Sequence, residues 1–88
     1  MKTIVFIGSN KSGSSYEAIK AADSMQYYTV LLTDRRSFVD KTEGFQYVHS
    51  IRYCNLNNID EIRNIIDLYG YNFATAVKCP EIWTHSLL

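Results

Sequence analysis

The sequence predicts a three-layer α/β domain with a parallel sheet of about four strands in the order 3-2-1-4. A continuous apolar run at residues 4–7 is typical of a central strand that is covered on both faces. Apolar residues at helical spacing then alternate along the chain with further strand-like runs, which indicates βαβ units. Since crossovers between parallel strands are right-handed, the first strand is expected between the second and the last.

Composition limits the classes of protein that this chain can represent. Its 88 residues, 47% of them hydrophobic, suffice for one small domain with a core, so we expect a single domain over residues 1–88. Nine Lys and Arg balance nine Asp and Glu, so the net charge attracts neither nucleic acid nor an anionic membrane. Residues 1–3 lead directly into the first strand without a signal-peptide or transmembrane pattern, and we expect a cytoplasmic protein.

The first helix is predicted to begin at Ser14. Ser14 and Glu17 form the S-x-x-E pattern of a capping box, in which the serine side chain accepts the backbone N–H of Glu17. Apolar residues then recur at helical spacing until the helix ends near Gln26: Ala18, Ile19, Ala21, Ala22 and Met25. A second strand follows over residues 28–33, "YTVLLT", and the charged segment "DRRS" ends it.

The next segment predicts an edge strand and a second helix. Side chains alternate over residues 47–53 as in a half-exposed edge strand, whereas residues 37–46 show no defined element. Asn58 followed by Glu61 predicts a helix cap, and Gly70 is the expected terminator. The apolar face of this helix consists of Ile59, Ile62, Ile65, Ile66 and Tyr69.

A fourth strand and a short last helix complete the predicted domain. The strand covers residues 71–77, "YNFATAV", and Pro80 suits the first turn of the helix "PEIWTHSLL". Apolar residues concentrate at this end of the chain, and the strand forms an edge of the sheet. We therefore expect a homodimer that joins two copies through the fourth strand and the last helix. The alternative is that the last helix folds back and covers the sheet.

The glycine-containing loop at residues 8–14 is the candidate binding site. Ligands of parallel sheets bind beyond the carboxyl ends of the strands, at the point where the strand order reverses, which is this loop. A P-loop requires a lysine directly after its second glycine, but Ser14 follows Gly13 and the lysine is Lys11. The pattern therefore does not fit a P-loop. A loop that only makes a tight turn, and binds nothing, is a structural alternative.

A dinucleotide site is another alternative for this loop. The two glycines match the outer positions of the G-x-G-x-x-G fingerprint, but Asn10 stands at the middle position, where a side chain obstructs the pyrophosphate. After the second strand, Asp34 is suited to bind a ribose, and Arg35 and Arg36 are suited to bind a 2′-phosphate.

Zinc and thiol catalysis are not predicted. The chain contains two cysteines and two histidines, but no C-x-x-C or H-x-x-x-H pair places two ligands on one turn. No sequence feature places a base beside Cys54, as a cysteine hydrolase requires. We therefore expect no metal site among His49, Cys54, Cys79 and His85.

The segments "MKTIVFIGSNKSGSSYEAIKAADSMQYYTVLLTDRRS" and "NIDEIRNIID" resemble the opening of ATP-grasp ligases, enzymes that join a carboxylate to an amine or a thiol. The resemblance covers roughly residues 1–70 and implies a Rossmann-like pre-ATP-grasp domain. In such a domain the glycine-rich loop faces the substrate end of the active site. The residues that take this role are Gly8, Ser9, Asn10, Lys11, Ser12, Gly13 and Ser14.

The resemblance also implies what this chain does not do alone. In the family, ATP and Mg²⁺ bind to two later lobes, which an 88-residue chain does not contain, so we expect no cofactor on this chain and no catalysis by it. Two features depart from the family pattern. Gln26 stands where the family usually has a glycine, at a position that often requires a positive φ, and the stretch after Gly70 differs.

Overall fold

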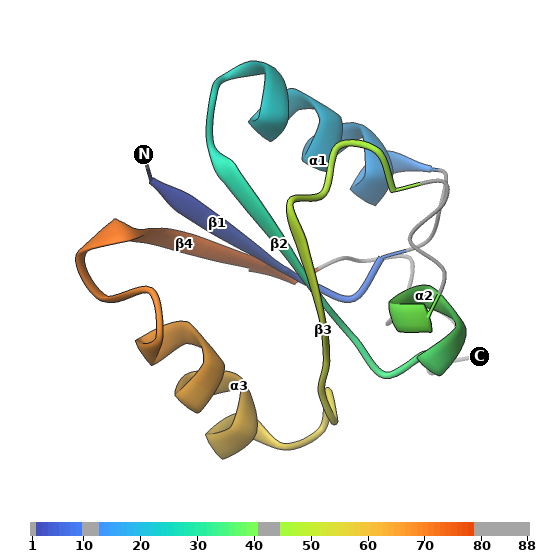
Figure 1. Ribbon diagram of the computed structural model, residues 1–88, viewed down its shortest axis with the longest axis vertical. Helices are drawn as coiled ribbons and strands as arrows, with labels where there is room; N and C mark the ends of the chain where they lie inside the picture. The colour runs from blue at the N-terminus through green and yellow to red at the C-terminus, as the bar shows by residue number, and fades with distance from the viewer. Residues whose placement is uncertain (1, 10–12, 41–44, 79–88) are drawn as a thin grey trace.

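The computed structural model describes residues 2–9, 13–40 and 45–78. Its elements follow one another in the order β1 (Thr3–Ile7), α1 (Ser14–Ser24), β2 (Tyr28–Thr33), α2 (Arg36–Asp40), β3 (Ser50–Tyr53), α3 (Ile59–Asp67), the single-turn 3-10 helix η1 (Gly70–Asn72) and β4 (Phe73–Lys78) (Figure 1). The predicted last helix lies outside the described residues.

The four strands form one sheet in the order β3-β2-β1-β4, and all three pairs are parallel. The predicted α/β, Rossmann-like fold and strand order are therefore confirmed. β1 and β2 pair in register from Thr3 opposite Tyr28 to Ile7 opposite Leu32. Figure 1 shows α1 and α3 on opposite faces of the sheet, so the domain has three layers.

Each face of the sheet has its own apolar core. On the face covered by α1 and α2, the buried residues are Phe6, Ile19, Ala22, Leu31, Phe38 and Phe45. On the face covered by α3, they are Val5, Val30, Leu32, Cys54 and Leu56. Because successive side chains of a strand point to opposite faces, β1 and β2 contribute to both cores.

The two long helices begin differently. The cap of α3 is as predicted, since Asn58 Oδ1 accepts the Glu61 backbone N–H at 3.2 Å. The predicted capping box at Ser14 is wrong, because Gly13 is the N-cap of α1 and makes no side-chain hydrogen bond. Gly13 has φ 95, a conformation that L side chains rarely adopt, so the glycine takes the cap and Ser14 becomes the first helical residue.

Several elements in the second half of the chain differ from the sequence prediction. α3 ends at Asp67 with Leu68 as its C-cap, and Gly70, the expected terminator, begins η1. β3 begins at Ser50 rather than at residue 47. The His49 N–H bonds to the Thr29 carbonyl at 2.9 Å, but the Thr29 N–H bonds to the His49 ring instead of to the backbone of the preceding segment. A short helix, α2, occupies part of the segment for which no element was predicted. β4 begins at Phe73, because η1 precedes it.

β4 is an edge strand of the sheet, as expected. Thr75 and Val77 are both exposed. The last helix, which is the other half of the expected dimer interface, lies outside the described residues, so the homodimer stays a prediction.

The chain turns from α1 into β2 through a residue with a positive φ. Gln26 has φ 68, and its N–H donates to the Asp23 carbonyl at 2.9 Å, while the Tyr27 N–H donates to the Ala22 carbonyl at 3.1 Å. These two bonds make a Schellman motif, in which glycine is the preferred residue at the position of Gln26. The expectation of a positive φ at Gln26 is confirmed.

We predict that Gln26→Gly stabilises the domain by about 1 kcal/mol, because glycine has no Cβ that opposes the left-handed conformation. Urea unfolding measures the difference. The control is Met25→Gly, since Met25 has φ −88 and gains nothing from glycine, so that variant is expected to be less stable than the parent. A lower unfolding midpoint for Gln26→Gly would contradict the prediction.

Candidate functional site

The loop after β1 begins beside the end of β2. The Gly8 N–H donates to the Leu32 carbonyl at 2.8 Å, which continues the β1–β2 pairing by one bond. Gly8 then has φ 79, so the chain leaves the sheet through a conformation that favours glycine. Ser9 is buried directly after this turn. The backbone therefore passes close to the carboxyl edge of the two central strands.

A buried hydroxyl pair joins the two ends of this loop. Ser9 Oγ and Ser15 Oγ lie 3.0 Å apart, and both residues are buried. Gly13 caps α1 between them, and its carbonyl accepts the Glu17 N–H at 3.1 Å. Ser14 is exposed at the first helical position.

The structure thus places four of the seven predicted loop residues at one edge of the sheet: Gly8, Ser9, Gly13 and Ser14. Three others lie outside the described residues: Asn10, Lys11 and Ser12. The N-terminus of α1 points toward this edge, and the partial positive charge of a helix N-terminus favours an anion.

The segment after β2 lies at the same edge. Asp34 is exposed, and the Arg35 backbone N–H donates to Thr33 Oγ1 at 3.1 Å. Both guanidinium groups lie over aromatic rings of the domain. Arg35 is 5.1 Å from the ring centre of Phe38, and Arg36 is 4.1 Å from that of Tyr53.

These distances are typical of cation–π contacts, so the two arginines stabilise α2 and the end of β3. The sequence predicted the two arginines only as ligands of a 2′-phosphate. Phe38 is only three residues after Arg35, whereas Tyr53 is far from Arg36 in the chain and no local pattern pointed to it.

Cys54 follows β3 at this edge and was not predicted to belong to it. Its N–H donates to the Thr33 carbonyl at 2.8 Å, and its side chain is fully buried. Burial raises the pKa of the Cys54 thiol, the charge and hydrogen bond of Glu61 raise it further, and Asp34 adds to the effect. The thiol is therefore protonated near neutral pH and is a poor nucleophile. Its position directly after the third strand was the signal that could have placed it here.

The structure keeps the candidate zinc and hydrolase residues apart. His49 precedes β3 and Cys54 follows it, so the strand separates the two side chains. Cys79 and His85 lie outside the described residues. Within residues 2–9, 13–40 and 45–78, no group of three or more His, Cys, Asp or Glu side chains could hold a metal ion.

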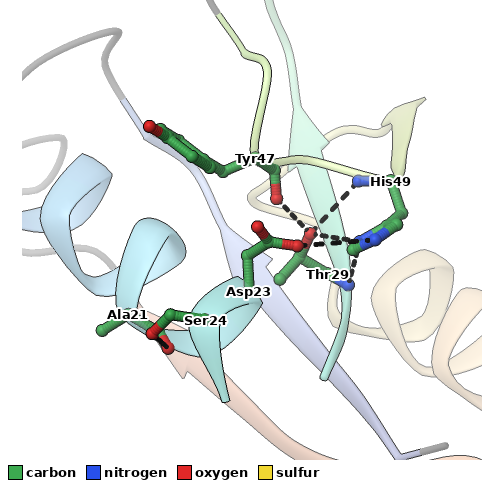
Figure 2. Close-up of polar contacts among 6 residues, drawn as sticks. All are labelled: Ala21, Asp23, Ser24, Thr29, Tyr47 and His49. Carbon is green, nitrogen blue, oxygen red and sulfur yellow. Dashed lines mark hydrogen bonds and ion pairs between the residues drawn. The ribbon is translucent and has the colours of Figure 1, made fainter. Parts of the chain in front are cut away.

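A second polar cluster, which the sequence did not predict, lies at the opposite, amino edge of the sheet (Figure 2). The Thr29 hydroxyl donates to the Tyr47 carbonyl at 2.6 Å and accepts the His49 backbone N–H at 3.1 Å. The Thr29 backbone N–H donates to His49 Nδ1 at 3.0 Å. His49 Nε2 lies 3.6 Å from Asp23 Oδ1 in the last turn of α1.

These contacts define the state and the role of the His49 ring. Because Nδ1 accepts the Thr29 N–H, the proton of the neutral ring is on Nε2, which faces the Asp23 carboxylate. The cluster joins α1, β2 and the segment that leads into β3 (Figure 2). Thr29 is fully buried and its hydroxyl donates to the Tyr47 carbonyl, so this hydroxyl is not accessible to a substrate. The arrangement is therefore structural.

Comparison with protein-family models, with characterised proteins and with solved structures found no match for this chain. Across the part of the chain that the structure describes, no helix has the length and apolar character needed to cross a membrane.

We predict that Thr29→Val destabilises the domain by about 1–3 kcal/mol, because the Tyr47 carbonyl loses its donor in a partly buried setting. Thermal or urea unfolding measures the loss. Thr75→Val is the matched control, since Thr75 is exposed on β4 and its hydroxyl makes no hydrogen bond with the described residues. We expect the control to stay within about 0.5 kcal/mol of the parent. Equal effects of the two changes would contradict the role of the cluster.

The raised pKa of Cys54 predicts a pH dependence of stability. The folded thiol remains protonated above the pH at which the unfolded thiol ionises, whose ordinary pKa is 9.0. Unfolding then releases a proton, so the contribution is complete below pH 9.0 and is lost as pH rises through the folded pKa. We expect stability to fall less steeply above pH 9.0 in Cys54→Ala than in the parent. Parallel curves of urea midpoint against pH would disprove this.

Proposed function

We propose that this chain is the N-terminal domain of an ATP-grasp-type ligase, and that its β1–α1 loop forms the substrate-side wall of the active site. The observation that supports the proposal most is the strand order. β1 lies between β2 and β4, so the order reverses at the carboxyl end of β1, where the loop begins. In open parallel sheets this reversal point is where ligands bind.

The local backbone is suited to a substrate that carries a carboxylate or an acyl phosphate. Gly8 and Gly13, at the two ends of the loop, both have a positive φ and lack a Cβ, which lets a ligand approach the backbone closely. The N-terminus of α1 favours the negative charge of such a group. The domain would bind and orient the substrate, and a cytoplasmic location is part of the proposal.

The reaction of the complete enzyme would need parts beyond this chain. ATP would phosphorylate the carboxylate to give an acyl phosphate and ADP, and an amine or thiol would then displace phosphate. ATP and Mg²⁺ would be held by the two later lobes, so the isolated domain would be catalytically inactive. This assignment can be tested in the gene, because the reading frame after codon 88 should encode phosphate-binding lysines and metal-binding carboxylates.

A dinucleotide-binding module is the second candidate, and one observation favours it. Asp34 is exposed directly after β2, at the same edge as the β1–α1 loop. An acidic side chain at this point of a Rossmann-like fold is suited to bind the ribose of a nicotinamide cofactor. Titration with NADH and NADPH tests it, and saturable shifts of the Asp34 amide would favour this candidate over the ligase domain.

Phosphate and acetyl phosphate are the probes for the leading proposal. In an amide NMR titration we expect saturable shifts at Gly8, Ser9, Gly13 and Ser14. Gly13→Ala is expected to weaken binding at least about tenfold, because a Cβ opposes φ 95 and alters the loop. Gly70→Ala is the matched control, since Gly70 also has a positive φ but lies beyond α3 and has open space around it.

Two results would overturn the anion site. The first is a set of phosphate shifts confined to another surface of the domain. The second is an equal loss of affinity in Gly13→Ala and Gly70→Ala, which would indicate a general effect of destabilisation.

A further inference from the structure

A cavity of about 370 Å³ lies at the amino edge of the sheet, at the opposite end from the β1–α1 loop. It is lined by Thr3, Tyr28, Tyr69 and Asn72. Thr3 and Tyr28 are the first residues of β1 and β2, and Tyr69 and Asn72 belong to the turn between α3 and β4. The volume falls within the range of sites that bind small molecules.

The Thr3 side chain is a buried polar group without a hydrogen-bond partner among the described residues. Thr3 is 2% exposed, and its hydroxyl makes no hydrogen bond within the described parts of the chain. The buried Thr29 and Thr33 hydroxyls differ, because each is hydrogen-bonded to the backbone. Buried hydroxyls normally make a hydrogen bond, so we expect the Thr3 hydroxyl to bond to a molecule inside the cavity that this residue lines.

Two aromatic rings form fixed walls of the cavity. The Tyr28 ring stacks on the His49 ring with centroids 5.0 Å apart, and the Tyr69 hydroxyl accepts the Arg52 Nε–H at 3.2 Å. The two tyrosine rings are 6.4 Å apart and inclined by 44°. At that separation they contact each other, so a third flat ring does not fit between them. They are suited to a ligand that rests against them.

The described lining groups favour an uncharged ligand. Among the residues that the structure describes, none of the lining side chains is charged, and a buried charge without a counter-charge loses its hydration. Lys2 precedes Thr3 in the chain, and its charged Nζ–H donates to the Tyr71 carbonyl at 3.1 Å. Threonine and tyrosine hydroxyls and the asparagine amide each donate and accept hydrogen bonds, as sugar hydroxyls also do.

We propose that this cavity binds a neutral monosaccharide, whose hydroxyls bond to Thr3 and Asn72 and whose C–H face rests on the tyrosine rings. The sugar would supply the missing partner of the Thr3 hydroxyl. This site is independent of the β1–α1 loop, because the two lie at opposite ends of the strands.

Amide NMR titrations of the whole chain with D-glucose, D-galactose and D-mannose test the proposal, with D-glucuronate as the charged counterpart. We expect saturable shifts around Thr3, Tyr28, Tyr69 and Asn72 with at least one neutral sugar. Glucuronate is expected to bind at least tenfold more weakly than glucose if glucose binds. The absence of saturable shifts with all three neutral sugars would overturn the proposal, as would tighter binding of glucuronate.

Substitutions separate binding from folding. Thr3→Val keeps the side-chain shape and removes only the hydroxyl, so we expect at least tenfold weaker sugar binding with no loss of unfolding midpoint. Thr75→Val makes the same change on β4 away from the cavity and is expected to bind as the parent does. Asn72→Leu removes the amide that would bond to the sugar, and it is also expected to weaken sugar binding. Undiminished sugar binding in Thr3→Val and Asn72→Leu would overturn the site, whatever the phosphate titration of the loop shows.

Discussion

β1 is the element on which the rest of the structure depends. It pairs in parallel with β2 on one side and with β4 on the other, and its Val5 and Phe6 side chains enter different cores. Both residues are almost completely buried. A strand in this position must be apolar on both faces, and the helices on the two faces then have a common surface to pack against. The three layers of the domain follow from this single strand.

The composition of the carboxyl edge follows from the same pairing. Since the strands are parallel, the segments that leave β1, β2 and β3 all emerge at one edge. This brings Gly8, Asp34 and Cys54 to neighbouring positions, although they are far apart in the chain. The edge combines a glycine-bounded loop, a helix N-terminus and a buried thiol whose pKa is raised. The first two features are suited to an anion, and the third contributes to packing.

The amino edge is closed by side chains rather than by a longer strand. His49 Nδ1 accepts the Thr29 N–H, so a ring nitrogen takes the place of a backbone carbonyl, and regular pairing of β2 with β3 begins one residue later. The His49 ring also stacks on Tyr28, which forms a wall of the cavity that Thr3 lines, so the same histidine holds that wall in place. The two edges thus have separate roles, with backbone conformation dominant at one and side-chain contacts dominant at the other.

The sequence by itself determined the features that depend on local chemistry. The periodicity of β2, the Asn58 cap and the position of Gln26 depend on neighbouring residues, and the strand order followed from the handedness of crossovers. Four of the seven loop residues proposed as the site lie at the predicted edge for the same reason. Only the tertiary structure decided that Gly13 rather than Ser14 caps α1 and that β3 begins at Ser50. It also decided which residues line the cavity beside Thr3 and which groups bond to Thr29. The cap follows from the left-handed backbone of Gly13, whereas the other outcomes depend on contacts between residues distant in the chain, which local periodicity does not encode.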